Sequence, residues 1–211
     1  MGYVMRYILF CLLFSSWPAQ ANELDHLLTI LNNTLADTER HQAALQQGKE
    51  RGLVCKYCHG QDGNSKRNYI PNLAQQNPQY LLHQFELFAS KVRKDRIMSE
   101  LAANLSAEDR VNIALYYTSQ TVKPQADYRP ELRAQGETLY NETCVSCHGV
   151  NGYGKQTLPR IASQPAKYLS KTLMAYRSGS GPRPKSPMQY VASRLNNADI
   201  DALISYITAM K

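Results

Sequence analysis

Two five-residue stretches of the chain each combine two cysteines and a histidine in the order Cys-x-x-Cys-His. They consist of Cys55, Cys58 and His59, and of Cys144, Cys147 and His148. Two thiols three positions apart can bond to the vinyl groups of one porphyrin, and the adjacent histidine can then ligate its iron. The two motifs therefore predict two covalently bound haem c groups. The main alternative is a zinc site that pools the cysteine pairs, but zinc accounts neither for the histidine after each pair nor for the repeat described below.

A low-spin haem needs a second axial ligand opposite the histidine, and a methionine thioether there raises the reduction potential. Met98 follows His59 by 39 residues, and Met188 follows His148 by 40. Both are expected in non-helical, cation-rich stretches before the last helix of their half. His83 is the competing ligand in the first half, but it has no counterpart in the second. The predicted iron ligands are therefore His59, Met98, His148 and Met188.

The sequence around the motifs occurs twice, at an offset of 88 to 90 residues. Residues 70–74 correspond to 158–162, Tyr80 to Tyr168, and Met98 to Met188. Ser106 and Asn196 are suitable N-caps for a last helix in each half. Middle helices are expected from about Pro78 and Pro165, and no segment alternates as a strand does. The predicted fold is all-α and built twice, with domains at residues 46–120 and 132–211 and a linker at 121–131.

The N-terminal residues have the pattern of an export signal. Residues 7–17 are apolar, and the small-residue pattern up to Ala21 predicts cleavage after that residue. The apolar run is short for a membrane anchor, which is the alternative interpretation. Leucines near helical spacing then predict a helical extension over residues 22–45. It is expected to pack on the first domain, with a docking helix for a partner protein as the alternative.

Charge is unevenly distributed along the chain. Without the signal peptide, residues 22–123 contain 12 basic and 11 acidic residues, and residues 124–211 contain 11 basic and 6 acidic residues. Clusters of Lys and Arg precede both methionines, and they include Lys91, Arg93, Lys94, Arg96, Arg177, Arg183 and Lys185. These cations either steer an acidic or membrane-associated redox partner or serve only as solvated loop charge. An exported protein is not expected to bind nucleic acid.

The repeated motifs resemble the dihaem cytochrome c4 family, which has tandem class I cytochrome c domains. In the first half the resemblance rests on residues 54–65, on Pro71, Leu73 and Ala74, and on residues 98–120. In the second half it rests on residues 144–152, on Leu158 and Pro159, and on residues 188–210. The residues before 46 and the Gly- and Pro-rich segment 178–187 depart from the family pattern.

The resemblance implies a periplasmic electron carrier of the respiratory chain, with two His/Met haems that face each other across a domain interface. Its partners would be an electron donor and a terminal oxidase or reductase. An electron-transfer subunit of a dehydrogenase complex, for example beside a flavoprotein, is the alternative function. A dihaem peroxidase or sulfur-compound oxidase would need an open iron position, which two methionine ligands do not leave. The sequence therefore predicts a carrier and not an enzyme.

Overall fold

The computed structural model describes residues 19–126 and 128–211, with side chains from Glu23 onward. Within these residues the fold is helical and contains no strand, only an isolated bridge between Lys155 and Leu158. The all-α prediction is therefore confirmed. The predicted signal peptide falls mostly on residues 1–18, outside the described residues. No helix in the described part is long and apolar enough to cross a membrane.

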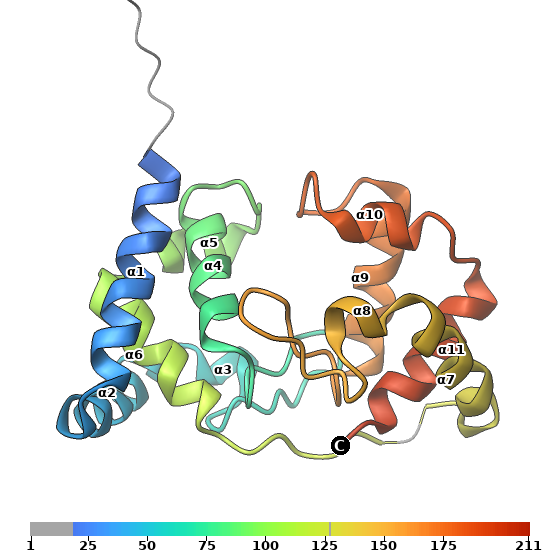
Figure 1. Cartoon of the computed structure of the whole chain (residues 1–211), viewed down its shortest axis with the longest axis horizontal. Helices are drawn as coiled ribbons and strands as arrows, with labels where there is room; N and C mark the ends of the chain where they lie inside the picture. Colours follow the sequence, from blue (N-terminus) through green and yellow to red (C-terminus); the bar gives the residue numbers. More distant parts are fainter. Residues whose placement is uncertain (1–18, 127) are drawn as a thin grey trace, which may run out of the picture.

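The helices form two groups that lie side by side, joined by a chain segment along the lower edge of Figure 1. The first group contains α1 (Ala19–Leu35), α2 (Thr38–Arg51), η1 (Gly52–Val54), α3 (Lys56–His59), α4 (Pro78–Ala89), α5 (Arg96–Ala103) and α6 (Ala107–Thr118). The second group contains η2 (Pro130–Leu132), α7 (Arg133–Thr143), α8 (Val145–His148), α9 (Ala166–Ser178), α10 (Pro187–Ala192) and α11 (Asn197–Ala209). Residues 121–126 and 128–129 between the groups carry no helix.

The two groups repeat one architecture. In the first, α2 packs along α6, and in the second α7 packs along α11. In each repeat the long helix before the Cys-x-x-Cys-His motif therefore contacts the last helix. The helices that carry the methionines, α5 and α10, pack on α4 and α9 respectively. The last helices begin alike, because Ser106 and Asn196 each form a capping box with the aspartate three residues later. The predicted N-caps are therefore confirmed.

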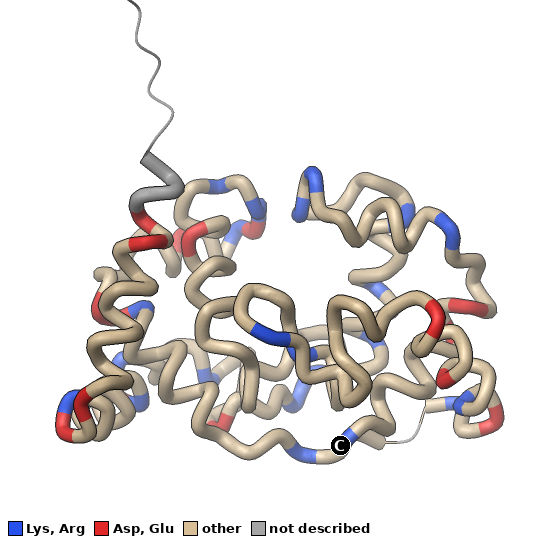
Figure 2. Tube along the Cα trace, viewed as in Figure 1, with Lys and Arg blue, Asp and Glu red and all other residues tan. Residues whose placement is uncertain are grey.

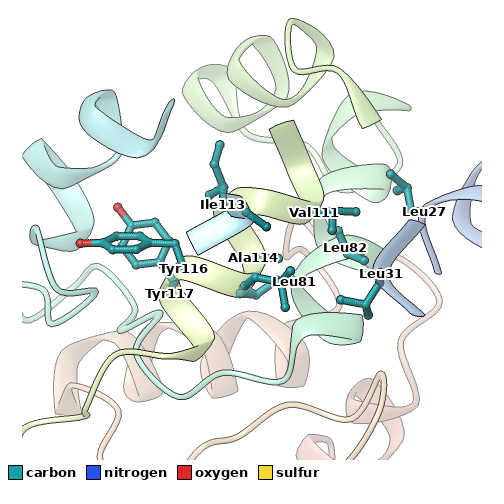
Figure 3. Packing of buried hydrophobic residues seen from close by; sticks show 11 residues of the cluster. Leu27, Leu31, Leu81, Leu82, Val111, Ile113, Ala114, Tyr116 and Tyr117 are labelled. Atoms are coloured by element: carbon teal, nitrogen blue, oxygen red, sulfur yellow. The ribbon is translucent and has the colours of Figure 1, made fainter. Parts of the chain in front are cut away.

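The core of the first half has an additional helix layer. Leu27 and Leu31 of α1 are fully buried, and α1 packs against α2, α4 and α6. Figure 3 shows these leucines next to Leu82 of α4 and Val111 of α6. Burying such side chains stabilises the half by about 1.5–3 kcal/mol each. The predicted N-terminal helical extension thus contributes its apolar face to the first core.

The core of the second half is built without such a layer. Its buried residues are Tyr140, Leu169, Leu173, Leu195, Ile200, Leu203, Ile204 and Ile207. They come from α7, α9, α11 and the turn before α11. Cys144 and Met188 pack against this cluster, as Cys55 packs against the first. Each candidate site therefore lies against a separate apolar core.

Candidate functional site

Each Cys-x-x-Cys-His motif forms a single helical turn. In the first, the N–H groups of Cys58 and His59 donate to the Cys55 carbonyl at 3.1 and 2.9 Å. In the second, the N–H groups of Cys147 and His148 donate to the Cys144 carbonyl at 3.3 and 3.0 Å. This turn holds two thiols and one imidazole close together on a short segment, as attachment and axial ligation of one porphyrin require.

The four described cysteines are free thiols and form no disulfide with one another. Cys55, Cys58 and Cys144 are half-buried, and Cys147 is exposed. Burial raises the pKa of Cys55, and it raises that of Cys144 to about 11. Among residues 23–126 and 128–211, no three His, Cys, Asp or Glu side chains are grouped to hold a metal ion. The two cysteine pairs are therefore not pooled as the zinc alternative requires.

Both motif histidines are buried and make the same hydrogen bond. His59 Nδ1 lies 2.9 Å from the Pro71 carbonyl oxygen, and His148 Nδ1 lies 3.0 Å from that of Pro159. A carbonyl oxygen can only accept, so each Nδ1 carries the proton and each Nε2 keeps its lone pair. Burial also lowers the pKa of both histidines, which favours the neutral ring. Each imidazole is oriented as a ligand that binds metal through Nε2.

A glycine turn holds the proline loop beside each histidine. Gly63 has φ +72°, and its carbonyl accepts from the N–H groups of Leu73 and Ala74. A Cβ on Gly63 would lie 2.6 Å from the Ala74 nitrogen, so no other residue fits without moving this turn. Gly152 makes the same contacts with Ile161 and Ala162 in the second half. The glycines after each motif thus bring the histidine-binding carbonyl into place.

The two methionines occupy matching positions, but the prediction that they lie in non-helical stretches is wrong. Met98 lies in the first turn of α5 and Met188 in the first turn of α10. Asp95 accepts from the Met98 N–H at 2.8 Å, and Ser186 accepts from the Met188 N–H at 3.3 Å. These N-caps start short helices immediately before the methionines. Both methionine side chains are half-buried.

Three other residues could in principle ligate iron, namely the competing ligand His83 and the methionines Met174 and Met210, and they differ from this matched pair. His83 is half-buried on α4, and burial lowers its pKa. Met174 lies on α9 with 41% of its surface exposed, and Met210 follows α11 at the C-terminal end. None of these residues has an equivalent in the other repeat, so only Met98 and Met188 extend the symmetry of the motifs.

Six of the seven cations before the methionines divide into two groups, and the seventh, Arg177, is half-buried and donates to the Leu195 carbonyl at 3.2 Å. Lys91, Lys94, Arg96 and Lys185 are exposed, and basic segments of the loops before α5 and α10 face each other between the halves (Figure 2). Arg93 and Arg183 are instead drawn inward. Burial and the neighbouring charge of Arg183 lower the pKa of Arg93. The expectation that all these cations are solvated or steer partners is therefore wrong for Arg93 and Arg183.

The inward arginines belong to a cluster where the halves meet. Arg93 stacks on Phe88 at 4.2 Å, and its repeat equivalent Arg183 lies 5.7 Å from the Tyr176 ring. Arg183 also donates to the Tyr168 hydroxyl at 3.2 Å. The Nε atoms of both arginines are shielded from solvent and have no hydrogen-bond partner in the described part of the chain. The same holds for Nε and Nη2 of Arg160.

Sequence reasoning overlooked two further residues beside the histidine loops. Gln76 and Gln164 are buried and bind the backbone of the opposite half. The signal was present, because residues 71–76 and 159–164 share the pattern Pro-x-(Leu/Ile)-Ala-x-Gln. The two glutamines lie two residues after the matched Ala74 and Ala162, at equivalent positions of the repeat.

Comparison with known proteins gives a consistent result. The cytochrome c family model matches residues 133–211. Cytochrome c4 of Pseudomonas aeruginosa is 36% identical over 197 residues, which cover 87% of this chain and 96% of that protein. The thiosulfate dehydrogenase electron acceptor of Thiomonas intermedia is 31% identical over 171 residues, covering 74% of this chain and 77% of the relative.

The solved structures agree with the sequence relatives. The crystal structure of reduced recombinant cytochrome c4 from Pseudomonas stutzeri superposes with a TM-score of 0.72 and 33% sequence identity. The match covers 79% of this chain and 98% of that chain. The similarity thus extends through both halves. This chain belongs to the cytochrome c4 family and is an electron-transfer cytochrome with two covalently bound haem c groups.

Proposed function

We propose that Cys55 and Cys58 attach one haem and that Cys144 and Cys147 attach the other. His59 and Met98 are the axial ligands of the first iron, and His148 and Met188 are those of the second. The observation that carries this assignment is the repeated geometry of the histidines. Each lies one helical turn after its first cysteine and donates from Nδ1 to a proline carbonyl.

The surroundings of the motifs fit a haem. A porphyrin brings a large apolar ring and two carboxylates. Cys55 and Cys144 adjoin the two apolar cores. Arg93, Arg160 and Arg183 provide shielded guanidinium nitrogens without hydrogen-bond partners in the described residues, and such groups suit carboxylates. When bound, each haem supplies an iron that accepts and releases one electron.

The residues of the chain would assist electron transfer by keeping the same ligands on each iron in both redox states. The Pro71 and Pro159 carbonyls keep the proton on Nδ1 and orient each imidazole in both redox states. A thioether at the second axial position favours ferrous iron and raises the reduction potential. With a histidine and a methionine to hold each iron, the chain would leave no position for a substrate, which supports a carrier rather than an enzyme.

The location and partners follow from export and charge. Residues up to Ala21 have the pattern of a signal peptide, which supports a periplasmic protein cleaved after that residue. The exposed Lys91, Lys94, Arg96 and Lys185 support acidic or membrane-associated redox partners that are attracted electrostatically. These partners are an electron donor and a terminal oxidase or reductase of the respiratory chain.

The decisive experiment is an absorption spectrum of the reduced holoprotein with and without carbon monoxide, combined with haem quantification. Two haems per chain and no spectral change with carbon monoxide are expected, because both irons have six ligands. A haem that binds carbon monoxide would contradict one methionine assignment and favour an enzyme or sensor.

A second candidate function is an electron-transfer subunit of a dehydrogenase complex. It is favoured by the similarity to a thiosulfate dehydrogenase electron acceptor. Affinity purification of the tagged protein from its native periplasm distinguishes the two functions. A dehydrogenase that remains bound in high salt in a fixed ratio would support the subunit, and its absence supports the free carrier.

A further inference from the structure

Two buried glutamines join the halves in a reciprocal arrangement. Gln164 Nε2 donates to the Asn72 carbonyl at 3.0 Å, and the Asn72 N–H donates to Gln164 Oε1 at 2.9 Å. Gln76 Nε2 donates to the Arg160 carbonyl at 2.9 Å, and the Arg160 N–H donates to Gln76 Oε1 at 2.7 Å. Each side-chain amide thus binds one residue of the opposite half through both its N–H and its C=O.

The bound residues directly follow the histidine-binding prolines. The Pro71 carbonyl and the Asn72 N–H belong to one peptide group, which accepts from His59 on one side and donates to Gln164 on the other. The peptide between Pro159 and Arg160 connects His148 to Gln76 in the same way. A single planar peptide therefore lies between each histidine and the glutamine of the other half.

Backbone geometry directs both glutamines across the interface. Gln75 and Ser163, the residues before them, have φ +53° and +57°. This left-handed conformation is uncommon for residues other than glycine. Their N–H groups donate to the Tyr117 and Ile207 carbonyls of the last helices. Each turn is thus fixed to its own half, while the following glutamine is only 4% exposed and binds the other.

We infer that Gln76 and Gln164 are positioning residues, each of which tunes the iron site of the opposite half. Hydrogen bonds in a chain polarise one another. An acceptor on the Asn72 N–H makes the Pro71 oxygen a stronger acceptor for His59 Nδ1–H. The imidazole then becomes a better donor to the iron, which stabilises ferric iron and lowers the potential. This inference rests on the proposed function, in which His59 and His148 are the iron ligands.

The test is a redox titration, monitored by NMR, of the haem-loaded variants Gln164→Leu and Gln76→Leu. Signals are assigned to each half by comparison with Met98→Ala and Met188→Ala. Leucine has a side chain of similar size that fills the buried space but cannot form either hydrogen bond. Gln164→Leu is expected to raise the potential of the first site and leave the second unchanged. Gln76→Leu is expected to do the opposite, and each variant also shifts the Nδ1–H resonance of the affected histidine.

Asn77→Ala is the matched control for loosening the interface. Asn77 Nδ2 donates across it to the Tyr153 and Leu158 carbonyls at 3.0 and 2.7 Å, but Asn77 does not bind either histidine-binding peptide. Both potentials are expected to remain at their wild-type values. If Gln164→Leu or Gln76→Leu fails to fold, Gln164→Ala or Gln76→Ala is used in its place.

The outcomes separate this inference from the proposed function. The inference is supported if each variant shifts the reduction potential of the iron site in the opposite half only. Equal shifts of both potentials, a shift only of the potential in the variant's own half, or no shift of either potential would overturn the inference. The wild-type carbon monoxide spectrum tests ligation independently, so unchanged potentials in a protein with two six-coordinate haems would reject the glutamine role alone.

Discussion

Gly48 of α2 lies against the Asn112 carbonyl of α6, so that a Cβ added to the glycine would be 2.0 Å from that oxygen. Gly136 of α7 has the same relation to the Ala202 carbonyl of α11, also at 2.0 Å. The crossing of the first and last helices in each repeat therefore depends on one glycine.

Gly48→Ala is expected to destabilise the first half by about 1–3 kcal/mol, because the added methyl group forces α2 and α6 apart. Alanine has the higher helix propensity, so a loss of stability must come from the crossing. Denaturant unfolding of the holoprotein, followed by circular dichroism, measures the change. Gln42→Ala, at an exposed position of α2, is the control and should change stability little. Equal midpoints for the two variants would contradict this close packing.

Leu31→Ala is expected to cost about 2–5 kcal/mol, since the side chain is 1% exposed in the first core and its loss leaves a cavity. Leu35→Ala makes the same change one turn later, where 47% of the side chain is exposed. It should cost only a few tenths of a kcal/mol. Thermal unfolding of both holoproteins measures the difference. If the two variants melted together, α1 would contribute nothing to the first core.

Met98→Ala and Met188→Ala are each expected to free one iron position. One haem of each variant should bind carbon monoxide in the reduced state, and its potential should fall because the thioether no longer favours ferrous iron. Spectroelectrochemistry with and without carbon monoxide measures both effects. Met174→Ala, on the exposed side of α9, should behave as wild type. An unaltered spectrum in either ligand variant would remove that methionine from the assignment.

His83 predicts a pH dependence of stability. Burial lowers its pKa in the folded protein, whereas the unfolded value is about 6.5. The unfolded chain therefore binds a proton more readily as the pH falls below about 6.5, and the free energy of unfolding decreases. His83→Gln should lose less stability than wild type between pH 7 and 5, measured by denaturant titration at each pH. His26→Gln, at an exposed position, should keep the wild-type slope.

The sequence predicted the elements that depend on local chemistry. The spacing in each Cys-x-x-Cys-His motif is itself one helical turn, and Ser106 and Asn196 cap helices through contacts only three residues away. The α1 helix was predicted from its leucines, and Leu27 and Leu31 are buried in the first core, whereas Leu35 at the end of the helix is exposed. The domain limits and the iron ligands remain predictions.

Features that depend on tertiary contacts were predicted less well. The short methionine helices are an exception, because their caps Asp95 and Ser186 are preferred N-cap residues that bond only two or three positions ahead, a local signal that the sequence analysis overlooked. Arg93 and Arg183 were grouped with the exposed cations because charge alone does not reveal stacking on Phe88 and Tyr176. The two glutamines bind backbone atoms 84 to 92 residues away in the chain, and no local pattern encodes such a partner.

The helix crossings are closed within each half, whereas the bonds between the halves join segments far apart in the chain. The α2–α6 crossing closes the first half within its own sequence, and the α7–α11 crossing closes the second. The glutamine bonds between them join segments 84 to 92 residues apart in the chain and can form only after both halves exist. Separation of the intact halves would break these bonds while leaving both helix crossings closed. The Asn72 and Arg160 amide hydrogens should exchange with solvent through that hinge-like separation, before those in the crossed helices.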